Sequence, residues 1–112
     1  MKERAKELLR YLGCNATYRG YHQTALACEL VCKDEYLLLR VTLELYPKVA
    51  EICGCNVDNV ERNIRTIIQH AWDQYPDRLA EIARCELKYP PTVSEFLDYL
   101  VVYIQREMMA NK

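Results

Sequence analysis

The sequence predicts an all-α protein, and three observations support this fold class. Apolar residues recur at helical spacing along most of the chain and nowhere alternate as in a β-strand. The 3 glycines and 4 prolines stand mostly between these helical patterns, where they can end or begin a helix. The chain has 112 residues, 51% of them hydrophobic, which is sufficient for one domain with a core. We therefore expect a compact bundle of six to seven helices formed by residues 1–112.

Three helices are expected in the first part of the chain. The first covers residues 2–12 and is followed by Gly13, which can end a helix by adopting a positive φ. The second runs from residue 20 to about residue 33. The third, residues 35–45, is apolar on more than one side, which predicts that it is the central core helix. Its apolar residues are Leu37, Leu38, Val41 and Leu45 on one side and Leu39 and Leu43 on the other.

Residues 46–75 have the pattern of a helix-turn-helix. Pro47 suits the first position of a short helix, because the N–H that proline lacks is not needed there. Gly54 can end that helix, and Asn56 can cap a longer second one. Two helices joined by a short turn that contains glycine are typical of this DNA-binding motif. The apolar face expected for the short helix consists of Val49, Ala50, Ile52 and Cys53.

The second helix of this motif, at about residues 57–75, has two distinct faces. One is an apolar stripe at the spacing of a buried helix face. It consists of Val60, Ile64, Ile67, Ile68, Ala71 and Trp72. The opposite face is polar and charged. It consists of Asp58, Glu61, Arg62, Arg65 and Gln69. This division predicts a helix that packs on the core and presents charged groups to a partner such as DNA.

Two further helices are expected after the motif. A short one covers residues 77–86, and a rigid connector that ends at Pro91 follows it. Thr92 and Glu95 have the spacing of a capping box, so Thr92 opens the last helix. That helix is apolar over a wide arc, which predicts that it lies in the core and also offers a surface to another subunit.

Charge and composition limit the possible functions. The 15 basic and 16 acidic residues give a net charge of −1, so the chain lacks the bulk positive charge of a general nucleic-acid-binding protein. Specific DNA binding would then depend on a few placed side chains and a second copy of the protein. The chain contains no apolar run long enough to span a membrane and no apolar signal region, so we expect a cytoplasmic protein without a membrane partner.

Six cysteines are a large number for this length, and their spacing does not match a metal site. They are Cys14, Cys28, Cys32, Cys53, Cys55 and Cys85. No C-x₂-C pair occurs, and we expect buried, reduced thiols that act as small apolar residues, with no metal and no cofactor. The alternative is a zinc site. It would draw on Cys53, Cys55, Cys85 and either His22 or His70. The absence of a glycine-rich phosphate loop, together with two histidines far apart, predicts that the protein is not an enzyme.

Several motifs occur at the distances found in one known family. They are Gly20-Tyr21, Leu45-Tyr46-Pro47 with Ala50, Val60-Glu61-Arg62-x-Ile64-Arg65, Ala71-Trp72 and Pro91-Thr92-x-Ser94-Glu95-Phe96. With them, nearly the whole chain resembles the DNA-binding effector domain of the sporulation master response regulator of endospore-forming Firmicutes, the stage-zero sporulation protein A family. That family's effector domain normally follows a receiver domain, which these 112 residues do not contain. The chain is therefore expected to be a fragment or a stand-alone protein.

The resemblance implies a transcription factor that places its second motif helix in the major groove of double-stranded DNA, with tandem copies on neighbouring promoter boxes. The base-reading residues of the family fall on Glu61, Arg62 and Arg65. Further groove or backbone contacts are expected from Asn56, Asn59, Thr66 and Gln69. The segment 76–89 corresponds to the region that contacts RNA polymerase, which implies the sigma subunit as a partner.

Two alternatives remain open at the level of sequence. Glu61 and Arg65 are four residues apart in the favourable order, so they could form an ordinary surface salt bridge that contributes a few tenths of a kcal/mol. The near-neutral charge and the apolar last helix also fit a protein-interaction module that kept the helix-turn-helix shape but lost DNA binding. Asp58, Asn59 and Thr66 stand where family members tend to carry further basic or hydroxyl residues, which predicts weaker binding or an altered box.

Overall fold

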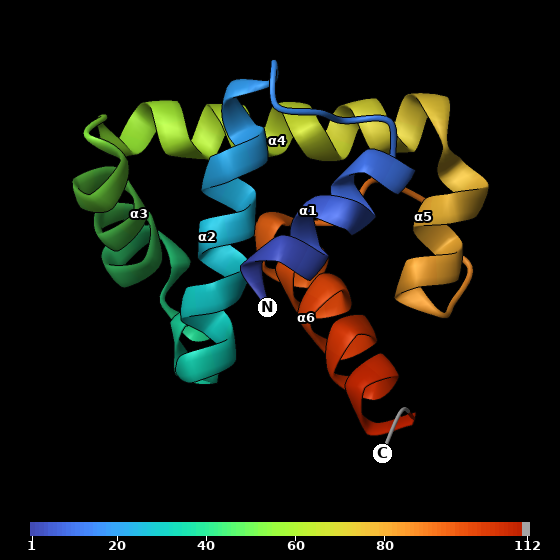
Figure 1. Cartoon of the computed structure of the whole chain (residues 1–112). Helices are drawn as coiled ribbons and strands as arrows, with labels where there is room; N and C mark the ends of the chain where they lie inside the picture. The colour runs from blue at the N-terminus through green and yellow to red at the C-terminus, as the bar shows by residue number, and fades with distance from the viewer. Residues whose placement is uncertain (111–112) are drawn as a thin grey trace.

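The computed structural model describes residues 1–110, and every regular element in this range is helical (Figure 1). The all-α prediction is therefore confirmed. The α-helices are α1 (Lys2–Tyr11), α2 (Arg19–Lys33), α3 (Tyr46–Cys53), α4 (Val57–Gln74), α5 (Pro76–Ala83) and α6 (Val93–Ala110). Two short segments between α2 and α3 complete the set, the 3₁₀-helix η1 (Glu35–Leu39) and the π-helix η2 (Val41–Leu45). Among residues 1–110, no helix is both long and apolar enough to cross a membrane.

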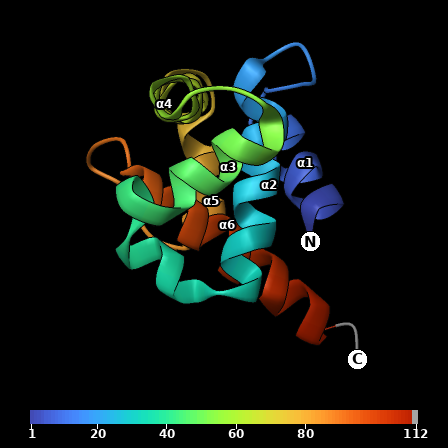
Figure 2. The same cartoon turned by 90° about the vertical axis from the view of Figure 1, so that its left-hand side faces the viewer.

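Helix α4 lies across one end of the molecule. In both views α3, α5 and α6 lie on one side of it, and the opposite face of α4 is open (Figures 1 and 2). The core lies beneath α4, where α6 packs against α1 and α2. Its largest fully buried side chains include Leu9, Leu12, Ile64, Ile67, Phe96, Leu97 and Leu100. Burial of each such side chain stabilises the fold by about 1.5–3 kcal/mol, so the apolar stripe fixes which face of α4 turns outward.

The two faces predicted for α4 are present. Five of the six residues of its apolar stripe are buried, and Trp72, which was also expected to be buried, is only partly covered. The helix begins as predicted, because the Asn56 side chain accepts a hydrogen bond from the Asn59 N–H at 2.9 Å. Gly54 ends α3 with φ +69°, the left-handed conformation expected at that turn.

The prediction of a single central core helix at residues 35–45 is wrong. The chain forms η1, breaks at Arg40 and continues as η2. Leu37 and Leu45 are buried, but Leu39 and Leu43 are 79% and 80% exposed. In one straight α-helix Leu37 and Leu45 would lie about 80° apart around the axis. The tighter and wider turns of η1 and η2 bring both onto the core side, leave Leu38 partly buried and leave Leu39 and Leu43 in solvent.

Smaller differences occur at helix ends. Ile52 and Cys53, expected on the apolar face of α3, are exposed because the last turn of that helix projects beyond the core. Helix α5 ends at Ala83 rather than at residue 86, where Arg84 takes a left-handed φ of 59°. The capping box that opens α6 is confirmed. The Thr92 N–H donates to the Glu95 carboxylate at 2.9 Å, and the Glu95 N–H donates to the Thr92 hydroxyl at 3.2 Å.

All six cysteines are free, but only part of the expectation about their burial holds. Cys14 and Cys28 are buried, and burial raises the pKa of the Cys28 thiol to about 12, so it stays protonated at neutral pH. Cys55 is half-buried. The prediction of burial is wrong for Cys32, Cys53 and Cys85, which are exposed. Each of these lies in the last turn of a helix or just after it, where side chains leave the core.

Helix α2 approaches α4 closely at Gly20. A Cβ atom at this position would lie 2.8 Å from Ile67 Cγ1 and 2.9 Å from the carbonyl carbon of Asn63, with the carbonyl oxygen of Asn63 nearer still. No side chain fits there without displacing one helix from the other. The glycine of the Gly20-Tyr21 motif thus sets the distance between α2 and the outward-facing helix.

Candidate nucleic-acid interface

The outer face of α4 forms a shallow, open hollow. The residues that line it are Asp58, Glu61, Arg62, Arg65, Thr66 and Gln69. All five residues predicted for the polar face are among them, together with Thr66. They lie between residues 58 and 69 of the 18-residue helix, which spans 57–74. The three residues that the resemblance implies as base readers therefore share one accessible surface.

Two of these residues form an ion pair. A guanidinium nitrogen of Arg65 lies 2.8 Å from a carboxylate oxygen of Glu61, and their side chains are 70% and 35% exposed. The salt bridge considered from sequence alone is therefore present. The pair is oriented along the helix surface and leaves the remaining guanidinium donors and the second carboxylate oxygen available to a ligand.

Arg62 is in a different situation. Its side chain is exposed, and within residues 1–110 it takes part in no ion pair. A guanidinium presents five N–H donors in a planar arrangement that fits two acceptors at once. Arg62 is thus the cation of this face that is least engaged within the protein.

The four residues expected to make further contacts already have roles within α4. Asn56 caps the helix through its side-chain oxygen, which accepts from the backbone N–H of Asn59. The Thr66 hydroxyl donates to the Arg62 carbonyl at 2.9 Å, and the Gln69 amide donates to Asp73 at 2.9 Å. These bonds order the outer face of the helix before any ligand is present.

A polar chain of contacts fixes α4 to the rest of the protein. The Asn63 amide donates to the Gln23 side-chain oxygen at 3.0 Å, and the Gln23 amide donates to Cys55 Sγ at 3.4 Å. These three residues belong to α4, α2 and the turn of the motif. Hydrogen bonds in such partly buried positions are directional, so they restrict how α4 can rotate on its apolar stripe. The spacing of single residues along the sequence could not reveal this connection.

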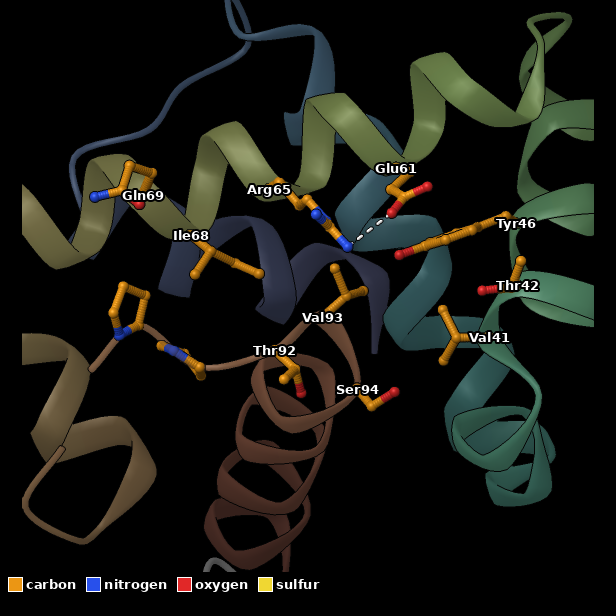
Figure 3. A pocket seen from close by; sticks show the side chains of 12 residues that line it. Val41, Thr42, Tyr46, Glu61, Arg65, Ile68, Gln69, Thr92, Val93 and Ser94 are labelled. Atoms are coloured by element: carbon orange, nitrogen blue, oxygen red, sulfur yellow. Dashed lines mark ion pairs between the residues drawn. The ribbon is translucent and has the colours of Figure 1, made fainter. Parts of the chain in front are cut away.

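A second groove runs beside the outer face, between α4, η2 and the start of α6 (Figure 3). Tyr46 lines it and is only 3% exposed, so its ring is part of the core. Its hydroxyl nevertheless points toward the Glu61–Arg65 ion pair (Figure 3). The Leu45-Tyr46-Pro47 motif contains this residue, but no local spacing indicated that its hydroxyl would lie beside the outer face of α4.

The residues considered for a zinc site are placed apart. His22 packs edge-on against Tyr21 with ring centroids 5.1 Å apart, and His70 packs against Tyr18 at 5.3 Å. Cys53 and Cys55 lie at the corner of the motif, and Cys85 follows α5. Across residues 1–110, no three histidine, cysteine or acidic side chains come close enough together to hold a metal ion.

Comparison with protein families identifies a family that covers most of the chain. The family model described as "Sporulation initiation factor Spo0A C terminal" matches residues 5–104. This range contains the helix-turn-helix formed by α3 and α4, the outer face of α4 and most of α6.

Proposed function

Because this chain belongs to the family of Spo0A C-terminal domains, we propose that it is a sequence-specific DNA-binding transcription regulator. The family consists of DNA-binding regulatory domains of a sporulation regulator and is not a family of enzymes. Membership agrees with the resemblance drawn from the sequence motifs. The placement of α4 in the major groove of DNA, the base-reading residues and the partners are our proposal.

Helix α4 would enter the major groove with its outer face. An α-helix with its side chains is about 10–12 Å across, and the major groove of B-DNA is about 12 Å wide. The single observation that carries the proposal is that the three expected readers line one open hollow on α4. The core, Gly20 and the Asn63–Gln23–Cys55 contacts hold that face in a fixed orientation.

The reading chemistry follows from the side chains. Arg62 and Arg65 each can donate two hydrogen bonds to O6 and N7 of a guanine, and Glu61 can accept from N4 of a cytosine. Each good pair discriminates against a wrong base by about 1–3 kcal/mol. We assign supporting contacts with the groove or the DNA backbone to Asn56, Asn59, Thr66 and Gln69.

Affinity must come from more than charge. Asp58 and Glu61 balance Arg62 and Arg65 on the outer face, and the whole chain has a net charge of −1. Few phosphates would be neutralised by one copy, so we propose that tandem copies on neighbouring boxes contribute to affinity. We propose the sigma subunit of RNA polymerase as a further partner, bound through α5 and the connector that follows it.

A DNA titration tests this function. The preferred box is first selected from random double-stranded DNA, and the affinities for this box and for a scrambled duplex are then measured by fluorescence anisotropy at several salt concentrations. We expect the box to bind at least about a hundredfold more tightly than the scrambled duplex. The logarithm of the affinity should also fall linearly with the logarithm of the salt concentration. Absence of binding at low salt would contradict the proposal.

Asp58→Asn should raise affinity for every DNA sequence. Asp58 is an exposed acidic residue in the first turn of α4, within the face assigned to DNA, and its carboxylate repels phosphates. Removal of one such exposed charge is expected to strengthen binding about twofold to fivefold at low salt. Because Asp58 also favours the helix N-terminus, the free energy of unfolding should fall by about 0.3–1 kcal/mol. Anisotropy with the selected and scrambled duplexes checks the first effect, and urea unfolding checks the second. A change in base preference would show that Asp58 itself reads DNA.

A protein-interaction module is the second candidate function, and one observation favours it. Tyr36, Leu39 and Leu43 are each at least 70% exposed on η1 and η2. Apolar side chains in such a position are typical of contact with another protein. If the titration shows no DNA binding at low salt, this function becomes the better explanation of the fold.

A further inference from the structure

Tyr46 is buried at the base of the helix-turn-helix, yet its polar end reaches the surface beside the reading residues. Its side chain is 3% exposed, and it is the first residue of α3. The ring therefore belongs to α3 and not to α4. Its hydroxyl points into the groove toward the Glu61–Arg65 pair (Figure 3).

The electrostatic environment of Tyr46 agrees with this position. Burial raises the pKa of Tyr46, the Glu61 carboxylate raises it further, and the Arg65 guanidinium lowers it. Both charges thus act on the phenol oxygen through space, although within residues 1–110 no hydrogen bond joins the Tyr46 hydroxyl to either side chain. A neutral phenol can donate its proton to a carboxylate oxygen or accept a hydrogen bond from a guanidinium.

The ion pair by itself favours one orientation only weakly. Arg65 is 70% exposed and has a long, flexible side chain, whose ordering costs up to about 2 kcal/mol. An i, i+4 ion pair on a helix surface returns only about 0.2–0.5 kcal/mol. Glu61 moves with the same helix, so the pair alone does not set its position relative to the rest of the motif. Tyr46, which comes from another helix, supplies that reference.

We propose that Tyr46 is a positioning residue for sequence reading, because its hydroxyl faces Glu61 and Arg65 across one groove and, through a hydrogen bond that a rotation of the Glu61 side chain would complete, favours the orientation in which they meet base edges. This inference rests on the proposed function and assigns Tyr46 no contact with DNA. When Glu61 directs one oxygen to a cytosine, the hydroxyl stabilises the other oxygen and keeps the arginine beside it. Arg62 is not in this groove, so its reading is independent of Tyr46.

Tyr46→Phe tests the inference, because it removes the hydroxyl and keeps the packed ring. Affinities are measured for the selected box and for duplexes with each base pair replaced in turn. We expect discrimination to fall about threefold to tenfold at the positions that Arg65→Ala also affects. Discrimination at the positions that Arg62→Ala affects, and the affinity for scrambled DNA, should remain unchanged. An unaltered profile would overturn the inference, and so would an equal loss at every position, which indicates a general structural effect.

Tyr21→Phe is the matched control. Tyr21 is also 3% exposed, and its hydroxyl accepts a hydrogen bond from Arg10 on α1 at 3.0 Å, away from the reading pair. This variant loses the same atom from an equally buried ring. It should keep the base profile of the wild type, even if its stability falls.

A second measurement does not depend on DNA and so separates this inference from the proposed function. The order parameter of the Arg65 Nε–Hε bond is measured by ¹⁵N relaxation in the free protein. We expect it to fall in Tyr46→Phe and to stay at the wild-type value in Tyr21→Phe. An unchanged value in Tyr46→Phe would overturn the positioning role. A wild-type protein without any base preference would refute the proposed function. The order parameter would still show whether Tyr46 orders Arg65.

Discussion

Arg62→Ala and Arg65→Ala are each expected to reduce the preference for the selected box over scrambled DNA by about tenfold to a hundredfold. Each substitution removes a guanidinium that we assign to a guanine, and such a pair contributes about 1–3 kcal/mol of discrimination. The loss should be confined to the base pairs that each arginine reads. Stability should change little, because Arg62 has no ion pair within residues 1–110 and the Arg65 pair is exposed. Anisotropy with single-base variants of the box provides the measurement.

Arg106→Ala and Arg62→Lys are the controls for this prediction. Arg106 is an exposed residue in the C-terminal part of α6, far from the outer face of α4, and its replacement removes the same charge. The Arg106→Ala variant should keep the base preference of the wild type. Arg62→Lys keeps the charge but loses the planar donors, so it should retain the affinity for scrambled DNA and lose the preference at one position. Full specificity in both alanine variants would refute the reading roles of these arginines.

Gly20→Ala should lower the free energy of unfolding by about 1–3 kcal/mol, because it inserts a methyl group between two packed helices. The new Cβ would meet the backbone of Asn63, which cannot rotate aside as a side chain can. Relief of the overlap requires α2 and α4 to separate, and this movement also stretches the hydrogen bond between Asn63 and Gln23. We therefore expect weaker binding to the selected box as well. Urea unfolding and anisotropy measure the two effects.

Gly54→Ala separates packing from backbone strain. No atom lies within 4 Å of the Cβ that this variant would add, but Gly54 has φ +69°. Gly54→Ala should lower the free energy of unfolding by about 1–2 kcal/mol, because of the left-handed conformation alone. Gly54→Asn should lower it less, because asparagine tolerates that conformation better than alanine. Gly20→Asn should lower the free energy of unfolding more than Gly20→Ala does, because the asparagine side chain is larger. A Gly20→Ala protein as stable as the wild type would show that α2 and α4 are not packed as closely as the structure indicates.

The helix-turn-helix was predictable because its signals are local. Pro47, Gly54 and Asn56 act within one turn of the chain, and each has the role in the structure that its residue type predicts. The apolar stripe of α4 was recognisable for the same reason, since a period of 3.6 residues specifies one face of a helix. Once one face is buried, the opposite face must be exposed, so the outward position of Arg62 and Arg65 followed from pattern alone.

Residues 35–45 show where local pattern fails. Leucines on two sides of a segment indicate burial on two sides only if the segment is one α-helix in the centre of the core. Here the break at Arg40 changes the direction of each side chain, and Leu39 and Leu43 are exposed. The three exposed cysteines were misjudged similarly, because their burial depends on how far each helix extends past the core.

The sequence by itself determined the helical class, the family, the position of the motif and the face on which Glu61, Arg62 and Arg65 lie. Each of these depends on residue type and on spacing along one helix or turn. Only the tertiary structure decided that Gly20 sets the distance from α2 to α4, that Gln23 links Asn63 to Cys55, and that the Tyr46 hydroxyl points toward the Glu61–Arg65 pair. These contacts join residues about 15 to 47 positions apart in the chain, as seen for Gly20 and Ile67. Their geometry arises from the packing of whole helices, which no local pattern specifies.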